Sequence, residues 1–264
     1  MTVIALKKIG ITGGTGLLGK LLVKELKREK KSYSLFTGDI FKKKQIIEWL
    51  TKNNNIEYIF HFAAYASAEN SKKNKKKAFR TNVVGTENLL NVLKLKKKKI
   101  ILFFSSSSHV YKYSKKPIKE SFTLEPISYY GKTKLLAEKN IRKKKNILLK
   151  YCIARIFSIF HDNQKKPFLY PSIKHKLKKI KSKKIRIKGA NNVRDFTNAE
   201  KVIKVIYKLF AKKSVGIYNI GSGKGMTIKK FINKNINKKK IVFDDQKPNF
   251  LVADIKKLKK EIKI

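Results

Sequence analysis

Short apolar runs alternate with segments of helical periodicity along residues 1–155. The runs at 8–12, 56–62 and 100–104 contain few polar residues, as in strands that are buried on both faces. Leucines recur at helical spacing after residue 16, so a helix follows the first run. Regular alternation of this kind predicts a parallel sheet with helices on both faces. In this part of the chain we predict strands at 8–12, 33–37, 56–62, 100–104 and 147–153, and helices at 17–26, 45–50, 77–95 and 134–142.

The pattern loosens after residue 156, where Pro167 and Pro171 interrupt it. We predict an α/β protein with a doubly wound parallel sheet over residues 1–155 and a smaller α/β substrate lobe over residues 156–264. No Gly/Ser-rich linker separates the two parts, so the boundary is soft and some later segments are expected to return to the main sheet. The later elements are predicted helices at 173–180, 199–210 and 227–236, and strands at 185–188 and 216–220.

The charge of the chain is strongly positive. There are 66 Lys and Arg against 17 Asp and Glu, which gives a formal net charge of +49. Only six of the basic residues are Arg, and the sixty Lys extend along the whole chain. Proteins that bind phosphate backbones favour Arg and gather charge on one face, so the spread of Lys favours a composition bias over a specific nucleic-acid partner. With 42% apolar and 11% aromatic residues, the chain can still form a packed core, which argues against disorder.

Several other classes of protein are disfavoured. Cys152 is the single cysteine, so an intramolecular disulfide is impossible, and no group of Cys and His has the spacing of a metal site. The apolar stretches are far shorter than the roughly 20 residues that a transmembrane helix needs. Residues 1–6 are apolar but too few for the core of a signal peptide. We therefore expect a soluble, cytoplasmic protein with neither a membrane partner nor a metal.

A glycine motif follows the first predicted strand. Gly13, Gly16 and Gly19 have the spacing G-x-x-G-x-x-G and open an amphipathic helix. Glycines allow a tight turn and let the backbone approach a pyrophosphate at the N-terminus of the next helix. The motif alone is weak, but its place between a strand and a helix predicts a Rossmann-like dinucleotide-binding domain.

A second motif can move protons. Tyr130 and Lys134 are four residues apart, so they share one face of a helix, and an ammonium at this spacing is expected to lower the pKa of the phenol. Such a phenol is a usable proton shuttle at neutral pH. In a chain with sixty Lys the pair also arises by chance, but Ser105-Ser-Ser-Ser108 ends an earlier strand. Doubly wound sheets bind ligands at the carboxyl ends of their strands, so the serines support the prediction.

Together these motifs resemble the extended short-chain dehydrogenase/reductase family, the NAD(P)-dependent epimerase/dehydratases that act on nucleotide sugars. The resemblance covers nearly the whole chain. It implies NAD or NADP as cofactor, a nucleotide-diphosphate sugar as substrate and a homodimer. The matching segments are Thr12-Gly-Gly-Thr-Gly-Leu-Leu-Gly19, His61-Phe-Ala-Ala64, Asn82-Val-Val-Gly-Thr86, Phe104-Ser-Ser-Ser-Ser-His-Val-Tyr111, Tyr129-Tyr-Gly-Lys-Thr-Lys134, Val193-Arg-Asp-Phe196 and Tyr218-Asn-Ile-Gly-Ser-Gly223.

The resemblance also implies a role for individual residues. The catalytic set would be Ser107, Tyr130 and Lys134, and Arg194 with Lys247 would neutralise the substrate diphosphate. The other substrate-binding residues would be Ser107, Ser108 and His109. The cofactor-binding residues would be Gly13, Gly16, Leu17, Leu18, Gly19, Asp39, Ile40, Phe62, Ala63, Ala64, Asn82, Tyr130 and Lys134.

Departures from the family pattern restrict the reaction. Lys247-Pro248 replaces an Arg-Pro pair, which keeps the charge but loses the bidentate fork. Dehydratases of the family carry acidic residues after the catalytic Ser or Thr, where this chain has Ser108 and His109, so a 4,6-dehydratase is disfavoured. His109 itself has two interpretations, an acid/base group at a sugar carbon or, more commonly for such a residue, a polar wall of the sugar pocket.

Asp39 leaves the choice between NAD and NADP open. It lies about 20 residues beyond the glycine loop, where an acidic residue accepts from the ribose 2′-OH of NAD. Alternatively, Gly38-Asp39-Ile40 is the adenine contact of the family, and the ribose end is open to NADP.

The expected function is hydride transfer at C4 of a nucleotide sugar, by a C4 epimerase or a 4-ketoreductase. The alternative from a different class is a Rossmann-fold protein that binds RNA or another polyanion without turnover of a sugar nucleotide.

Overall fold

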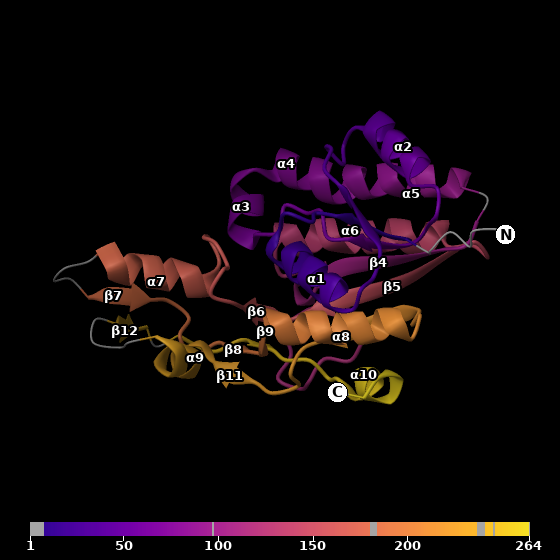
Figure 1. The fold of residues 1–264 in the computed structure, drawn as a ribbon. Helices are drawn as coiled ribbons and strands as arrows, with labels where there is room; N and C mark the ends of the chain where they lie inside the picture. The colour runs from indigo at the N-terminus through magenta and orange to yellow at the C-terminus, as the bar shows by residue number, and fades with distance from the viewer. Residues whose placement is uncertain (1–7, 97, 180–183, 237–240, 245, 264) are drawn as a thin grey trace.

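Among the residues that the structure describes, six parallel strands form a central sheet (Figure 1). This computed structural model describes residues 8–96, 98–179, 184–236, 241–244 and 246–263. The strands are β1 (Lys8–Thr12), β2 (Tyr33–Phe36), β3 (Ile56–His61), β4 (Ile100–Ser107), β5 (Leu149–Ile156) and β10 (Gly216–Ile220). Their order across the sheet is β10-β5-β4-β3-β1-β2, and every pair is parallel. The carboxyl ends of all six strands therefore meet at one edge of the sheet.

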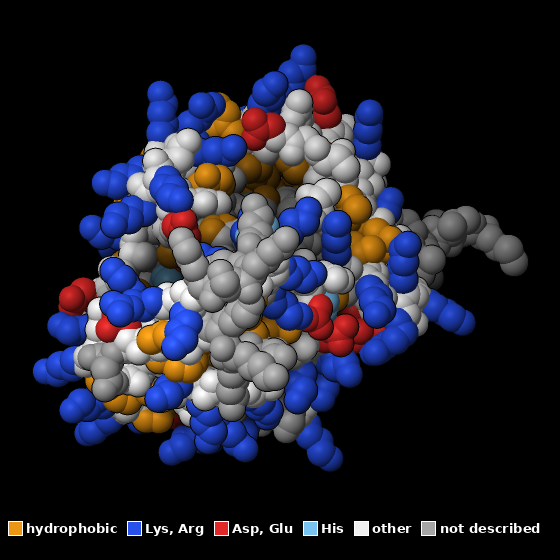
Figure 2. Space-filling model, turned by 90° about the vertical axis from the view of Figure 1, so that its left-hand side faces the viewer, with side chains coloured by type: hydrophobic (Ala, Val, Ile, Leu, Met, Phe, Trp, Pro, Cys, Tyr) orange, Lys and Arg blue, Asp and Glu red, His pale blue; other side chains and the backbone are white. Residues whose placement is uncertain are grey.

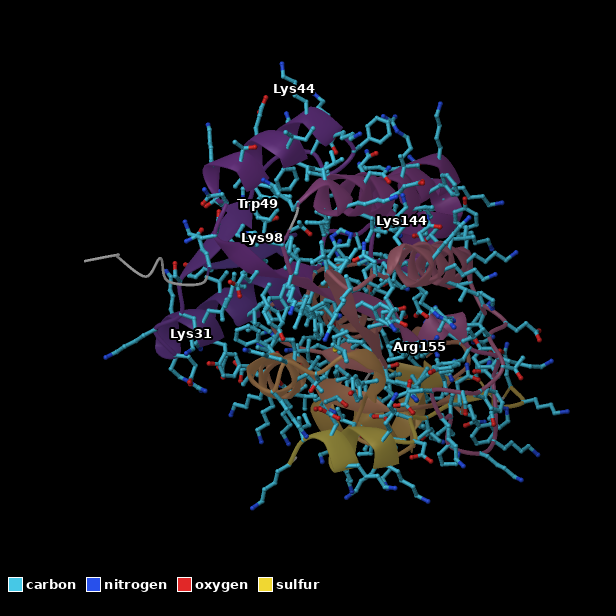
Figure 3. All side chains as sticks on the ribbon, turned by 90° about the vertical axis from the view of Figure 1, so that its right-hand side faces the viewer. Lys31, Lys44, Trp49, Lys98, Lys144 and Arg155 are labelled. Carbon is cyan, nitrogen blue, oxygen red and sulfur yellow. The ribbon has the colours of Figure 1, made fainter. Side chains whose placement is uncertain are left out.

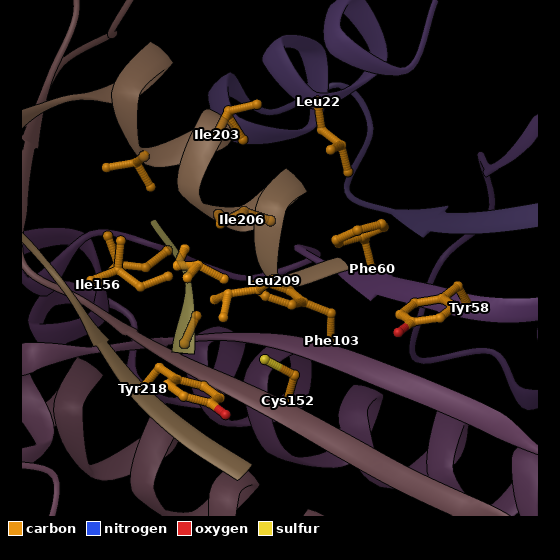
Figure 4. Packing of buried hydrophobic residues seen from close by; sticks show 14 of the residues in the cluster. Leu22, Tyr58, Phe60, Phe103, Cys152, Ile156, Ile203, Ile206, Leu209 and Tyr218 are labelled. Atoms are coloured by element: carbon orange, nitrogen blue, oxygen red, sulfur yellow. The ribbon is translucent and has the colours of Figure 1, made fainter. Parts of the chain in front are cut away.

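Helices cover both faces of this sheet. The helices are α1 (Leu17–Arg28) and α8 (Ala199–Ala211) on one face, and α2 (Lys43–Lys52), α5 (Gly85–Leu95) and α6 (Tyr129–Lys144) on the other. Successive strand residues point to opposite faces, so Phe60 and Phe103 pack under α1 and α8 while Ile59 and Leu102 pack under α2, α5 and α6. Figure 4 shows the first cluster, in which Leu22 and Ile206 point toward Phe60 and Phe103.

A smaller lobe extends from the carboxyl edge of the sheet (Figure 1, left). Its aromatic core includes Phe196 and Phe231, whose stacked rings have centroids 3.9 Å apart. The lobe contains α7 (Leu169–Lys179) and α9 (Ile228–Asn235), and its short strands are β6 (Ser158–Phe160), β7 (Ile185–Ile187), β8 (Val193–Arg194), β9 (Phe196–Asn198), β11 (Met226–Thr227), β12 (Ile241–Phe243) and β13 (Phe250–Leu251).

Short helical segments connect these elements. The loop after β3 leads into α3 (Ala68–Lys73) and α4 (Lys75–Phe79), and then into a π-helical turn, η1 (Arg80–Val84). After β4 comes a 3₁₀ turn, η2 (Ser108–Val110), and α10 (Lys256–Glu261) packs near β10. Of the helices that are described, none is both long enough and apolar enough to cross a membrane.

The element boundaries differ from the sequence-based prediction in informative places. The predicted helix 77–95 is divided by η1, where the backbone widens at Asn82; π turns often occur at functional sites. The strand predicted at 100–104 continues through three serines to Ser107, because these polar residues find hydrogen-bond partners inside the protein. The helix predicted at 173–180 begins at Leu169, and residue 180 lies outside the described residues.

Candidate active site

The glycine loop forms the turn between β1 and α1. Gly13 has φ +74°, and a Cβ there would lie 2.4 Å from the Ala63 nitrogen. A Cβ on Gly19 would lie 2.3 Å from the Gly13 carbonyl oxygen. Gly16 is different, because it is exposed and its nearest neighbour, also the Gly13 oxygen, would be 3.4 Å from a Cβ. Gly13 and Gly19 are therefore required for backbone packing, whereas Gly16 leaves space at the N-terminus of α1.

This helix N-terminus suits an anion. The first turn of α1 contains no acidic residue, and Gly16 occupies the N-cap position without a capping side chain. Leu17 and Leu18, half-buried, follow it directly. Backbone N–H groups at a helix N-terminus and the helix dipole together favour a phosphate group there. The turn thus has the shape and polarity that a pyrophosphate requires.

Asp39 and Ile40 lie just beyond β2, at the same edge of the sheet. The exposed Asp39 carboxylate accepts a hydrogen bond from the Phe41 N–H at 3.0 Å, so it stabilises its own turn. Ile40 is buried, and a Cβ on Gly85 would come within 2.6 Å of it. The second carboxylate oxygen of Asp39 can still accept from a ribose, so the structure keeps both interpretations of this residue open.

The end of β3 is fixed by a buried histidine. The His61 Nδ1 lies 2.6 Å from the Thr12 hydroxyl, and its Nε2 lies 2.9 Å from the Thr86 hydroxyl. Burial, followed by the nearby charge of Lys134, lowers the pKa of His61 to about 3, so the ring is neutral at physiological pH. The Thr86 hydroxyl donates to the Asn82 carbonyl at 2.7 Å, so we assign the ring proton to Nε2. His61 therefore links β1, β3 and α5, and the half-buried Phe62, Ala63 and Ala64 continue from it beside the glycine loop.

Asn82 joins the loop after β3 to α6. Its Oδ1 accepts from the Tyr65 N–H at 2.7 Å, and its Nδ2 donates to the Thr133 hydroxyl at 2.9 Å. Thr133 in turn donates to the Tyr130 carbonyl at 2.8 Å. Two successive hydrogen bonds, through Thr133, thus connect Asn82 to the backbone of Tyr130 and support the first turns of α6.

The three residues of the predicted catalytic set lie together at the end of β4 and the start of α6. Ser128 caps α6 by accepting from the Gly131 N–H at 3.0 Å, and a Cβ on Gly131 would lie only 2.1 Å from the His109 oxygen. Tyr130 and Ser107 lie close enough here for the Ser107 hydroxyl to lower the pKa of the phenol, against the larger effect of burial. Lys134 is one turn further along α6, with 1% of its surface exposed and its Nζ 4.2 Å from the centroid of the Phe104 ring.

The electrostatics of this set differ from the sequence-based expectation. Burial raises the pKa of Tyr130 above its ordinary value, and the hydrogen bond from Ser107 opposes this only in part. Lys134, which was expected to lower the pKa of Tyr130, is not among the groups that shift it. Burial lowers the pKa of Lys134 to about 7, against the opposing effect of Glu138. The expectation was wrong because it considered charge spacing and left out desolvation, the larger effect at a buried site.

His109 lies beside Tyr130, and the buried Ser108 precedes it in η2. The His109 Nδ1 lies 2.9 Å from the Ser128 hydroxyl, and its ring is T-shaped to the Tyr130 ring with centroids 6.0 Å apart. Burial, followed by the charge of Arg194, lowers the pKa of His109 to about 4. A neutral ring held by Ser128 fits a polar wall residue, and at neutral pH it has no proton to give as imidazolium.

Arg194 comes from β8 of the smaller lobe and is held in place by one loop. Its Nη1 donates to the carbonyl of Asn249 at 3.0 Å and its Nη2 to the Asn249 Oδ1 at 2.5 Å. The guanidinium lies 5.4 Å from the centroid of the Tyr113 ring. Lys247 is exposed, two residues before Asn249. Arg194 is thus brought near His109, whereas Lys247 lies on the surface of the loop that holds it.

Sequence reasoning missed two contributors. Asn249 could not be found from local spacing, because it meets Arg194 only through the pairing of β8 with β13. Glu138 did leave a signal, since it lies four residues after Lys134 and continues the same helix face. Among the described residues, no group of three or more His, Cys, Asp or Glu could hold a metal ion.

The comparisons with known proteins agree with this geometry. A family model described as GDP-mannose 4,6 dehydratase matches residues 12–264. The chain belongs to this family. It is therefore an extended short-chain dehydrogenase/reductase, as its sequence motifs predicted, and the fold prediction is confirmed.

Three relatives have related names. The chain is 28% identical to the GDP-6-deoxy-D-talose 4-dehydrogenase of Aggregatibacter actinomycetemcomitans, over 78% of this chain and 70% of that protein. It is 28% identical to the UDP-glucose 4-epimerase of Lactobacillus helveticus, over 83% and 77%. It is 27% identical to the dTDP-4-dehydro-6-deoxyglucose reductase of Escherichia coli, over 96% and 90%.

Solved structures share the fold at lower identity. RMD from Pseudomonas aeruginosa complexed with NADPH superposes with a TM-score of 0.84 at 20% identity, over 97% of this chain and 92% of that one. MoeE5 in complex with UDP-glucuronic acid and NAD gives a TM-score of 0.82 at 20% identity, over 96% and 91%. The three named relatives favour the enzyme interpretation over the polyanion-binding alternative. Figure 2 agrees, because Lys and Arg surround the whole outline of the face it shows and do not gather in one patch.

Proposed function

We propose that this protein is an NAD(P)-dependent nucleotide-sugar 4-ketoreductase. The observation that carries the proposal is the meeting of Ser107, at the end of β4, with Tyr130 and Lys134, on the first turns of α6, at the sheet edge where Gly16 leaves space for a pyrophosphate. Because burial raises the pKa of Tyr130, the phenol holds its proton at neutral pH and can donate it. Reduction of a 4-keto sugar requires such a donor at the C4 oxygen.

The residues would divide the reaction as follows. The nicotinamide of the bound cofactor supplies the hydride for C4. Ser107 would orient the C4 oxygen, Tyr130 would protonate it, and Lys134 would bind the nicotinamide ribose of the cofactor. Arg194 binds the substrate diphosphate through a guanidinium that Asn249 already holds in place. His109, neutral and fixed by Ser128, forms a wall of the sugar pocket.

A C4 epimerase is the second candidate, and the relative from Lactobacillus helveticus is the observation in its favour. Epimerisation uses the same residues, but the phenol must first accept a proton from the C4 hydroxyl. The raised pKa of Tyr130 favours reduction, because a phenol that holds its proton at neutral pH is a donor from the start. A 4,6-dehydratase stays disfavoured on the residues alone, since Ser108 and His109 occupy the positions after Ser107. The name of the matched family does not decide this point.

Two further features of the protein are part of the proposal. We retain a homodimer as its assembly, which sedimentation analysis tests directly. We also retain the cytoplasm as its compartment, which localisation of a tagged protein tests.

A substrate screen tests the proposed function. Purified protein is incubated with UDP-, dTDP- and GDP-4-keto sugars and with NADH or NADPH, and loss of the reduced cofactor is followed by absorbance. A ketoreductase consumes one cofactor per sugar reduced, whereas an epimerase interconverts the C4 epimers of an ordinary nucleotide sugar without net consumption. If no sugar in either panel is converted, the proposal fails.

Arg194→Ala should weaken the binding of substrate and leave the binding of cofactor nearly unchanged. Loss of a charge-assisted hydrogen bond costs about 1.5–3 kcal/mol, so we expect the substrate KM to rise by roughly 10- to 150-fold. The cofactor Kd should change little. Steady-state kinetics and calorimetry measure the two quantities. Arg186→Ala, which removes an exposed Arg of the same lobe, is the matched control for lost charge. An equal rise in KM in both variants would place Arg194 outside the substrate site.

A further inference from the structure

A buried ion pair lies directly behind the predicted catalytic residues. Glu138 and Arg155 each expose only 1% of their surface, and Figure 3 shows Arg155 inside the molecule while Lys31 and Lys44 lie at its periphery. Burial of charge is costly unless the group is paired and hydrogen-bonded. Most other charged residues of the chain lie at the surface, so packing alone does not explain why this ion pair is buried.

The geometry of the pair connects three elements. The Arg155 Nη2 donates to Glu138 Oε2 at 2.7 Å, and its Nε lies 3.1 and 3.2 Å from the two carboxylate oxygens. The Ser106 hydroxyl also donates to Glu138 Oε1. Ser106 immediately precedes Ser107 on β4, so this one carboxylate ties α6 to both β4 and β5. The alignment of Ser107 with Tyr130 depends on the same contact between β4 and α6.

Glu138 also affects the charge of Lys134. The groups around the Lys134 ammonium are the neutral His61 from β3, the Phe104 ring from β4 and Glu138 from α6, and Tyr130 lies one turn earlier on the same helix. Burial lowers the pKa of Lys134 to about 7, and Glu138 is the group that raises it again. Arg155, from β5, pairs with the same carboxylate and is not among the groups that shift Lys134. Glu138 lies four residues after Lys134 on α6, and each side chain is 1% exposed, so the carboxylate and the ammonium are buried on one face of the helix.

We propose that Glu138 is a positioning residue that keeps Lys134 charged and holds the serine strand against α6. Arg155 stabilises the buried Glu138 carboxylate, because its ion pair and hydrogen bonds offset the cost of removing that charge from water. The inference rests on the proposed function, since it assigns Glu138 an effect on a residue that would contact the cofactor. An apolar pair of the same size could hold the elements together, but it could not supply a negative charge to Lys134.

The test is the pH dependence of cofactor affinity, measured by calorimetry with NADPH and NADH across the neutral range. A charged Lys134 favours the anionic cofactor, so affinity should fall as pH rises through the pKa of Lys134, near 7. Among the groups named around it, His61 and Tyr130 titrate well outside this range. Glu138→Gln keeps the shape of the side chain and removes its charge. We expect the midpoint to fall by about one pH unit or more, with about a fivefold loss of charged Lys134 at pH 7.

Two further variants separate this effect from a loss of structure. Glu138→Gln leaves Arg155 unpaired and can unfold the protein, so the double variant Glu138→Gln/Arg155→Met removes both charges and should show the same lowered midpoint. Tyr111→Phe removes the hydroxyl that accepts from Arg155 at 2.8 Å and donates to Asn219 at 2.7 Å, in the same buried network. It should reduce the unfolding temperature and leave the midpoint unchanged.

Each outcome has one meaning. A wild-type midpoint retained in the folded double variant overturns the inference, and so does a midpoint that Tyr111→Phe lowers equally. If the wild-type protein binds neither cofactor, the proposed function itself has failed. A lowered midpoint in the Glu138 variants alone supports the assignment.

Discussion

Tyr130→Phe is expected to reduce kcat by about 10²–10⁴-fold, the usual cost of losing a general acid. The substitution keeps the ring, which packs against His109, and removes only the hydroxyl, whose pKa Ser107 influences. The fold and the cofactor Kd should therefore survive. The effect is measured as the single-turnover rate with a saturating 4-keto sugar and reduced cofactor, which isolates chemistry from product release.

Tyr129→Phe is the matched control for this experiment. Tyr129 is adjacent on α6, but its ring faces the Lys75 Nζ at 5.7 Å, and a Phe ring keeps that contact. We expect its rate to stay within a few-fold of wild type. A Tyr130→Phe variant with near-normal turnover, or a Tyr129→Phe variant that is the slower of the two, would refute the assignment of the phenol.

The pH dependence of the same reaction has a definite sign. Burial raises the pKa of Tyr130, so the phenol remains protonated through neutral pH, and proton donation should not be lost there. Burial lowers the pKa of Lys134 to about 7, so its charge is present below that pH and is lost as pH rises through it. The rate of reduction should therefore decline on the alkaline side of neutrality because of Lys134, well before Tyr130 ionises.

The sequence predicted the parts of this protein that depend on local spacing. Each of three motifs is confined to a few neighbouring residues. The pattern around them predicted that the glycine loop is a turn, that Tyr130 and Lys134 share a helix, and that the run of serines ends a strand. The family and the doubly wound sheet, both confirmed, came from these motifs and from the β-α alternation. The roles of the individual site residues stay predictions.

What the sequence could not show depends on contacts between distant segments. Asn249 reaches Arg194 across 55 positions, and Arg155 reaches Glu138 across 17. The buried environments of Tyr130 and Lys134 likewise arise only when β4 packs against α6, and the burial of Tyr130 raises its pKa where the spacing predicted a lowered one. Spacing along a helix predicts which charges are neighbours, but desolvation is a property of the assembled core.

The second large expected effect is a loss of cofactor affinity on substitution of Gly16. It can be separated from a loss of stability, because the glycines of the loop have different roles in the structure. Gly16→Val should leave the fold intact, since Gly16 has φ −73° and ψ 171°, which Val adopts readily, and a Cβ would come no closer than 3.4 Å to the Gly13 oxygen. The side chain would nevertheless fill the space through which the backbone approaches the pyrophosphate.

For Gly16→Val we expect the cofactor Kd to increase by about 100-fold or more, the effect of losing two charge-assisted contacts to phosphate. Calorimetry with NADH and NADPH measures this change. Gly13→Ala is the contrasting variant, because it combines φ +74° with a Cβ only 2.4 Å from the Ala63 nitrogen. It should lower the thermal unfolding midpoint strongly, whereas Gly16→Val should lower it by only a few degrees. Unchanged cofactor affinity in a folded Gly16→Val protein would show that the loop is structural and that the cofactor binds elsewhere.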